Sequence, residues 1–362
     1  MERGTIAVEF LALHDRLLVF SVHDAQLTMA SVVIDDATLR EAADGFAVSM
    51  RRGGAGTSSN DLWRWLIAPV WRQISGNRLL VIVPDPNLGQ IPFAALRDPG
   101  GHYLIEQIAI ALSPASPFAR LPRFRYSRSV VAVGEPALDR RMFDLEPLPE
   151  SNREAQAVAA LYSQHRLFTG QAATRENVLR AAAGADVLHF ATHAVVVPSD
   201  PPASYLALAA SDESSGALSV RDIQRATLTS MSLVVLAGCK TAPTIGTAPR
   251  ASSLALAFLS AGATSVLGTL WDLPDTDISL KMAVRFHEQI RHNADPASAL
   301  QTMQLEMLRS PDPQRHSPAV WSCFQLYVQD SGALLKNELQ NRFETKTAAR
   351  VRLQERIPRR KR

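Results

Sequence analysis

The sequence predicts an α/β protein in which helices sandwich a mostly parallel sheet. Short apolar runs bounded by small or turn-forming residues occur at 187–191 and 233–237. Such runs suit the central strands of a parallel sheet, because helices cover both faces there. The runs alternate with segments of helical length and pattern, which is typical of chains that wind strands and helices in turn. This alternation predicts the fold class.

Residues 1–127 are predicted to form a smaller α/β domain. Between residues 5 and 33 short apolar runs alternate with polar breaks, which indicates a hairpin or small meander. Residues 37–50 and 61–74 have the apolar periodicity of helices, and residues 79–83 form an apolar run that predicts a buried strand. The N-terminal part therefore has its own set of strands and helices.

Residues 128–330 are predicted to form the main domain. The boundary lies near residue 127, because a passage rich in proline and arginine interrupts the pattern there. The expected elements are strand 130–134, helix 150–163, helix 175–183, strand 187–191, strand 205–210, strand 233–237, helix 251–261, strand 265–270, helix 276–292, helix 296–309 and strand 323–328.

Composition places the chain among ordinary soluble proteins. Of its 362 residues 46% are hydrophobic and 20% charged, and no apolar run reaches the roughly 18 residues that predict a membrane span. Cys239 and Cys323 are its only cysteines, and the first residues lack the pattern of a secretory signal. Since two cysteines form no disulfide framework, we expect a cytoplasmic protein.

Residues 331–362 form a basic tail. They carry ten lysines and arginines against three glutamates. Such a tail binds nucleic acid, acidic lipid or an acidic protein partner in some proteins, and in others it is a solvated helix or a disordered end. The sequence leaves both interpretations open.

Two of the predicted strands end at a reactive side chain. His193 follows the strand at 187–191, and Cys239 follows the strand at 233–237. Groups at the carboxyl ends of neighbouring parallel strands converge on one crevice. A thiol and an imidazole are the minimal nucleophile and base of a cysteine hydrolase, and a neighbouring imidazolium lowers the pKa of a thiol. The alternative for Cys239 is an inert core thiol.

Several further motifs follow in order between about residues 5 and 330. They are Pro-Phe-Ala-Ala-Leu at 92–96, Leu-Pro at 148–149 with Glu154, His-Phe-Ala-Thr-His at 189–193, Ala-Gly-Cys-Lys-Thr at 237–241, Ser-Val-Leu-Gly-Thr-Leu-Trp at 265–271 and Trp-Ser-Cys-Phe at 321–324. In this order they resemble the CHAT domain family of caspase-like (clan CD) cysteine peptidases. The resemblance implies a caspase-like fold, with a pseudo-caspase-like N-terminal domain, and a Cys-His dyad of Cys239 and His193.

The resemblance also implies the oxyanion donors and the biological setting. The donors are the backbone N–H groups of Cys239 and of the residue after the catalytic histidine. That residue is usually glycine in the family but is Ala194 here, so a positive φ at this position would strain the backbone. The family implies limited cleavage of a dedicated protein substrate after a protein activator binds, in bacterial defence or cell-death circuits. The alternative is a non-catalytic interaction scaffold with a caspase-like fold, in which the basic tail binds the partner. Ala194 favours this alternative, as does the absence of the helical repeats that many relatives carry upstream.

The other histidines of interest are assigned no metal. His189 and His193 are four residues apart, but a strand does not bring them together as a helix does, and further ligands are missing. His287 and His292 are five apart, which separates them around a helix. We therefore expect no metal and no cofactor, and interpret His189 as a histidine that orients the site.

Acidic residues follow the strand at 265–270. Asp272 and Asp275 lie beyond this strand, on the same edge as the predicted dyad. Carboxylates there would select a basic residue before the scissile bond. The alternative is that Asp275 or Thr276 caps the helix at 276–292.

Overall fold

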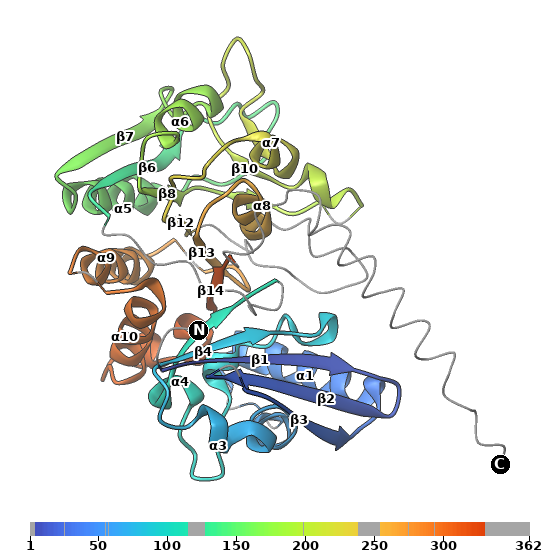
Figure 1. The fold of residues 1–362 in the computed structure, drawn as a ribbon. Helices are drawn as coiled ribbons and strands as arrows, with labels where there is room; N and C mark the ends of the chain where they lie inside the picture. Colours follow the sequence, from blue (N-terminus) through green and yellow to red (C-terminus); the bar gives the residue numbers. More distant parts are fainter. Residues whose placement is uncertain are drawn as a thin grey trace.

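The computed structural model describes residues 4–24, 26–54, 56, 58–114, 127–197, 199–237, 254–273, 275–292 and 294–329. One continuous sheet of eleven strands runs through these residues (Figure 1). In sheet order the strands are β3 (Gln26–Val33), β2 (Arg16–His23), β1 (Thr5–Ala12), β4 (Leu79–Val83), β5 (Ala109–Leu112), β14 (Phe324–Val328), β13 (Ser265–Thr269), β12 (Leu233–Leu236), β8 (Val187–Ala191), β6 (Ser129–Pro136) and β7 (Gln164–Gly170).

Most neighbouring strands in this sheet are parallel. The exceptions are the meander of β1, β2 and β3 and the antiparallel pair of β13 and β14. β8 lies between β12 and β6, parallel to both. The mostly parallel sheet predicted from the sequence is therefore confirmed, and so is the N-terminal meander.

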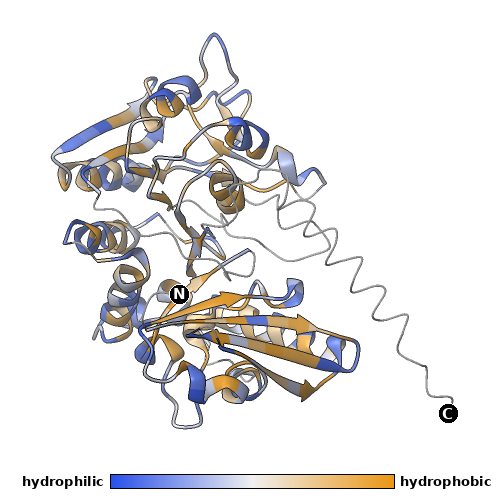
Figure 2. Ribbon diagram, viewed as in Figure 1, coloured by the Kyte–Doolittle hydropathy of each residue, from blue (hydrophilic) through white to orange (hydrophobic). Residues whose placement is uncertain are grey.

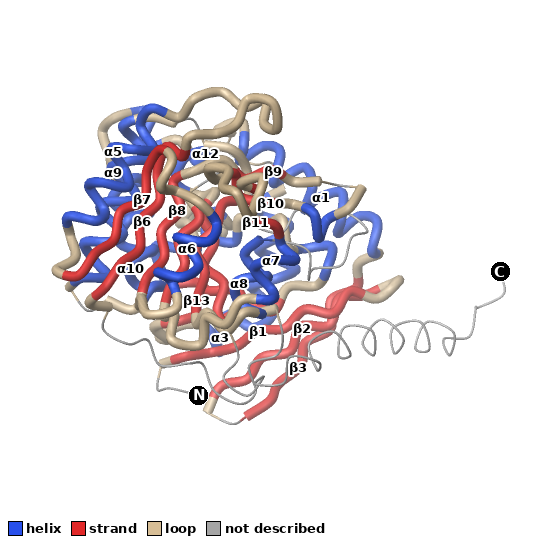
Figure 3. The backbone as a smooth tube through the Cα atoms, turned by 90° about the horizontal axis from the view of Figure 1, so that it is seen from above, coloured by secondary structure: helices blue, strands red, loops and turns tan. Residues whose placement is uncertain are grey.

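Helices cover both faces of the sheet (Figures 1 and 3). The longer helices are α1 (Asp36–Arg51), α5 (Pro149–Ala160), α6 (Arg175–Ala182), α7 (Val220–Arg225), α8 (Leu254–Ser260), α9 (Asp277–Arg291) and α10 (Pro296–Leu308). Successive side chains of a strand point to opposite faces. In β8, His189 faces α5 and α9, whereas the ring of Phe190 packs 5.8 Å from that of Phe258 in α8. Within the described ranges, no helix is long and apolar enough to cross a membrane.

Two local differences from the sequence prediction have clear causes. Residues 61–74 do not form one helix: α2 (Ser59–Leu62) passes through π-helical and 3₁₀ turns into α3 (Trp71–Ile74). Pro69 explains this break, because proline has no N–H to donate and its ring displaces the preceding turn. The edge strand β7 was not predicted because its first residues are polar, as their colour in Figure 2 shows, and these residues are also exposed to solvent.

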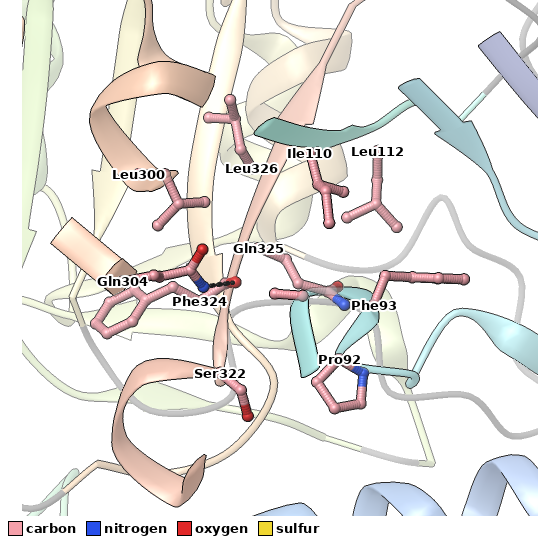
Figure 4. A pocket seen from close by; sticks show the side chains of 11 residues that line it. Pro92, Phe93, Ile110, Leu112, Leu300, Gln304, Ser322, Phe324, Gln325 and Leu326 are labelled. Atoms are coloured by element: carbon pink, nitrogen blue, oxygen red, sulfur yellow. Dashed lines mark hydrogen bonds between the residues drawn. The ribbon is translucent and has the colours of Figure 1, made fainter. Parts of the chain in front are cut away.

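The two halves of the chain meet at the centre of the sheet, where β5 pairs with β14. Close to this joint, the side-chain amide of Gln325 donates a 2.7 Å hydrogen bond to the carbonyl of Ile91, and that of Gln304 donates one of 2.9 Å to the carbonyl of Trp321. A cavity of about 10 Å³ remains between these elements (Figure 4), which is space for about one water molecule. The motifs at 92–96 and 321–324 thus pack this joint. The domain boundary near residue 127 stays a prediction.

Candidate functional site

The carboxyl ends of β8 and β12 lie side by side. The two strands are paired in parallel register, and the N–H of Ala237 donates a 2.9 Å hydrogen bond to the carbonyl of Phe190. His193 follows β8, and Cys239 follows Ala237 by two residues. Cys239 lies outside the described residues, so its role as nucleophile stays a prediction.

A small second sheet holds the backbone at His193. This sheet consists of β9 (Ala194–Val195), β10 (Tyr205–Ala207) and β11 (Ala217–Ser219). The buried hydroxyl of Thr192 donates a 2.6 Å hydrogen bond to the carbonyl of Ala207, whose N–H in turn donates a 2.9 Å bond to the carbonyl of His193. The imidazole is consequently displayed from a fixed backbone while its ring stays partly exposed.

The ring of His193 has a backbone partner that sequence reasoning missed. Its Nε2 lies 2.6 Å from the carbonyl oxygen of Glu146. A carbonyl only accepts, so Nε2 carries the proton and Nδ1 of the neutral ring is a free lone pair. Pro147 restricts Glu146 to extended conformations, and Pro149 begins α5. These two prolines are the sequence signal for a stiff segment that presents this carbonyl.

Ala194 has no backbone strain. The described non-glycine residues with positive φ are Asp24 and Glu135, so Ala194 does not adopt the conformation that favours glycine. The strain considered from the sequence is therefore absent. Its role as an oxyanion donor stays a prediction.

Asp275 lies close to His193, on the neighbouring helix end. Its Oδ2 accepts a 2.9 Å hydrogen bond from the N–H of Glu150, in the first turn of α5. Burial raises the pKa of Asp275, and this N–H and the charge of His193 both oppose the rise. Asp275 thus caps α5, whereas the N-cap of α9 is Thr276. Asp272 is exposed just beyond β13, and its role stays a prediction.

Two further carboxylates act on Asp275. The charges of Glu150 and Glu135 raise its pKa. Glu135 has a φ of +42° at the end of β6, where Gly134 pairs with Ala191 of β8. Glu135 could have been predicted as a site residue, because it directly follows the predicted strand at 130–134. Glu150 also pairs with Arg153 at 2.6 Å, so the three carboxylates and this one arginine leave a net negative charge around the end of β8.

The segment that contains Asp275 also contributes residues to an apolar cavity of about 300 Å³. Leu273 and Thr276, on either side of Asp275 in the sequence, both line it. Other lining side chains are Ile278, Ser279, Met282 and Val320. This volume is at the lower end of the range for small-ligand pockets.

His189 is fully buried below the site. Its Nδ1 lies 3.1 Å from Nε2 of His287, and its Nε2 lies 3.1 Å from Oε1 of Glu154. Nδ1 of His287 lies 2.8 Å from the hydroxyl of Tyr162. Burial, followed by the charge of His189, lowers the pKa of His287 well below its usual value. In the described part of the chain no group of three or more such side chains is placed to hold a metal ion.

The depressed pKa of His287 predicts a loss of stability in acid. Below about pH 6.5 the unfolded chain protonates this histidine while the folded protein does not, so unfolding takes up a proton. The free energy of unfolding should fall by up to ~1.4 kcal/mol per pH unit from this group. Urea denaturation at pH 5, 6 and 7 measures it. His287→Gln should flatten the slope and His292→Gln, at an exposed position, should not; equal slopes in both variants would contradict the assignment.

Comparison with known proteins adds the family. A family model described as the CHAT domain matches residues 57–329. The chain is 28% identical over 304 residues to Tetratricopeptide repeat protein 28 of Homo sapiens and 29% identical over 304 residues to that of Mus musculus. These matches cover 71% of this chain but 12% of each relative.

Among solved structures, the fold is similar to the crystal structure of the Saccharomyces cerevisiae separase–securin complex. The TM-score is 0.53 at 10% sequence identity, over 90% of this chain and 30% of that chain. At this identity the likeness shows the fold alone, and it agrees with the caspase-like sheet sandwiched by helices. The family model covers well over half of the sequence. The chain therefore belongs to the CHAT domain family.

Proposed function

We propose that the protein is a caspase-like cysteine endopeptidase with a dyad of Cys239 and His193. The observation that supports this best is the hydrogen bond from His193 Nε2 to the carbonyl of Glu146. In the neutral ring it leaves Nδ1 as the unprotonated nitrogen, at the end of β8 and beside the strand that leads to Cys239. A base needs this arrangement, with one ring nitrogen held and the other open to the nucleophile.

The reaction follows from these groups. Nδ1 of His193 takes the thiol proton of Cys239, and the thiolate attacks the scissile carbonyl carbon. Backbone N–H groups of Cys239 and Ala194 stabilise the oxyanion. The C–N bond then breaks, and the proton on Nδ1 passes to the leaving amine. Water, deprotonated by the same nitrogen, hydrolyses the thioester and regenerates the thiol.

The acidic surroundings support specificity for a basic residue before the scissile bond. Asp275 interacts with the charge of His193, and Glu135 and Glu150 are further carboxylates close to Asp275. Asp272 contributes as a further acidic group in this proposal. The neighbouring apolar cavity of about 300 Å³ is suited to an apolar substrate side chain near the basic one.

The proposal includes a regulated setting in the cytoplasm. By family resemblance we propose limited cleavage of one protein substrate after a protein activator binds, in a defence or cell-death circuit. The basic tail at 331–362 lies outside the described residues, and a nucleic-acid or acidic partner for it stays a proposal. The second candidate is a non-catalytic scaffold. The names of the curated relatives favour it, because they denote repeats and no peptidase activity.

Cleavage of a peptide library tests the proposal. Peptides with basic, acidic and apolar residues before the scissile bond are incubated with the wild type, Cys239→Ala and Asp275→Asn. We expect cleavage after Arg or Lys that is lost in Cys239→Ala and weakened about tenfold in Asp275→Asn, since a charged hydrogen-bond partner is removed.

Asp277→Asn is the matched control. Asp277 lies two residues away in the first turn of α9, where it pairs with Lys281, so its replacement should leave the preference intact. Cleavage that persists in Cys239→Ala would refute the dyad. Absence of cleavage by the wild type, even with cell lysate as a source of activator, would favour the scaffold.

A further inference from the structure

Four buried polar side chains form a continuous chain beneath the candidate site. Glu154 of α5 approaches His189 of β8 to 3.1 Å, His189 approaches His287 of α9 to 3.1 Å, and His287 approaches the Tyr162 hydroxyl to 2.8 Å. All four are at most 3% exposed. Burying four such groups costs free energy unless they form hydrogen bonds with one another. Packing alone therefore does not explain why four polar side chains occupy these buried positions.

This group of four side chains is electrically neutral when Glu154 and His189 share one proton. A lone carboxylate or a second imidazolium at this depth would be strongly disfavoured. With one proton between Glu154 and His189, Nδ1–H of His189 donates to Nε2 of His287. Nδ1–H of His287 then donates to the Tyr162 oxygen. Nδ1 of His189 and Nδ1 of His287 thus donate, and Nε2 of His287 accepts. This arrangement needs a neutral His287, which is consistent with its lowered pKa.

The link between Glu154 and His189 is close but poorly aligned. Glu154 Oε1 and His189 Nε2 lie 3.1 Å apart, yet neither has a partner in good hydrogen-bond geometry. A small displacement of α5 along β8 would therefore either align these two atoms into a hydrogen bond or move them apart. Buried polar atoms left in this condition are rare, and they occur where the structure stores strain or serves a function.

The chain joins the elements that build the site. Glu154 lies one helical turn beyond Glu150, whose N–H binds Asp275, and α5 is preceded by Glu146, whose carbonyl binds His193. His189 lies on β8, the strand that ends two residues before His193. His287 belongs to α9, which begins two residues after Asp275. Two hydrogen bonds and one close contact, between Glu154 and His189, thus connect β8 with both helices whose first turns face the site.

We propose that Glu154, His189, His287 and Tyr162 form a positioning network that sets the start of α5 against the end of β8. It thereby sets the hydrogen bond between the Glu146 carbonyl and His193, and with it the orientation of the proposed base. This inference rests on the proposed function for its catalytic consequence, but the geometry of His193 can be measured without any activity.

The test combines ring-nitrogen NMR of ¹⁵N-histidine protein with kinetics on the peptides above. Glu154→Gln keeps the shape of the side chain and removes its charge, and Tyr162→Phe removes the far end of the network. Tyr327→Phe is the matched control: this tyrosine is as buried and its hydroxyl donates to Gln325, away from the network. His193→Gln assigns the His193 signals.

In the wild type we expect a fixed His193 tautomer protonated at Nε2. Glu154→Gln should let both tautomers exchange and lower kcat by roughly 10- to 100-fold with little change in KM, because small misplacements of catalytic groups are costly. Tyr162→Phe should give the same change more weakly. Tyr327→Phe should leave the His193 signals unchanged.

The network is refuted if Glu154→Gln and Tyr162→Phe are folded and their His193 signals match the wild type, whatever their stability. If Glu154→Gln does not fold, the test is the comparison of the His193 signals in Tyr162→Phe with those in Tyr327→Phe. A protein without peptidase activity whose His193 signals nevertheless respond to Glu154→Gln would retain the network while refuting the proposed function.

Discussion

Replacing His193 by glutamine is expected to slow Cys239-dependent cleavage about 10²- to 10⁴-fold and to leave the fold intact. Glutamine can still donate to the Glu146 carbonyl, so the local structure has a partner, but it offers no basic nitrogen in place of Nδ1. General acid–base catalysis by one positioned group accounts for a factor of this size. The measurement is kcat/KM on the best library peptide, with folding checked by circular dichroism.

His292→Gln makes the same substitution at an exposed position at the end of α9, and it should keep full activity. Alkylation of Cys239 by an electrophilic peptide probe offers a second readout that needs no turnover. An alkylation rate equal in wild type and His193→Gln would show that this histidine does not activate the thiol.

Replacing Gly134 by alanine is expected to damage both stability and activity. A Cβ at this position would lie 2.4 Å from the carbonyl oxygen of Ser151 and 2.6 Å from Cβ of Ala155, both in α5. Since the obstacle includes backbone, α5 must move away from β6. Overpacking of this kind costs about 1–3 kcal/mol. Because α5 begins at the site, kcat should fall as well.

Gly184→Ala is the matched control, because a Cβ there meets nothing within 4 Å and the φ of Gly184 is not positive. Urea denaturation gives the change in the free energy of unfolding, and the library peptide gives kcat. If Gly134→Ala were as stable and as active as Gly184→Ala, α5 would not be held in close contact with β6 as described.

Patterns within one element could be predicted from the sequence. β8 and β12 are recognisable because buried parallel strands are largely apolar, with His189 of β8 as the exception, and the side chains after both strands mark the edge of the site. The helix at α9 follows from its periodicity. Strand β5 was missed because its four residues are too few to establish a period.

Contacts between distant segments could not be predicted in this way. Asp275 binds the backbone of Glu150, and His287 meets His189, across about a hundred residues in each case. No local rule relates such positions. The partner of His193 is a backbone carbonyl, which leaves no mark in residue type, and only the prolines around it gave a signal. The spacing of His287 and His292 argued against a zinc-binding pair, but spacing could not reveal the actual neighbours of His287.

The position of β14 has a consequence for how the protein is made. Among the described residues this strand is the last along the chain, yet it lies in the middle of the sheet, between β13 and β5. While the chain is being synthesised, the two flanking halves leave the ribosome with unpaired edges facing each other. They can unite only after residue 328 has emerged. A cell that makes this protein therefore has to shield two open sheet edges until β14 has been synthesised, and a ribosome that stalls before β14 releases a product prone to aggregation.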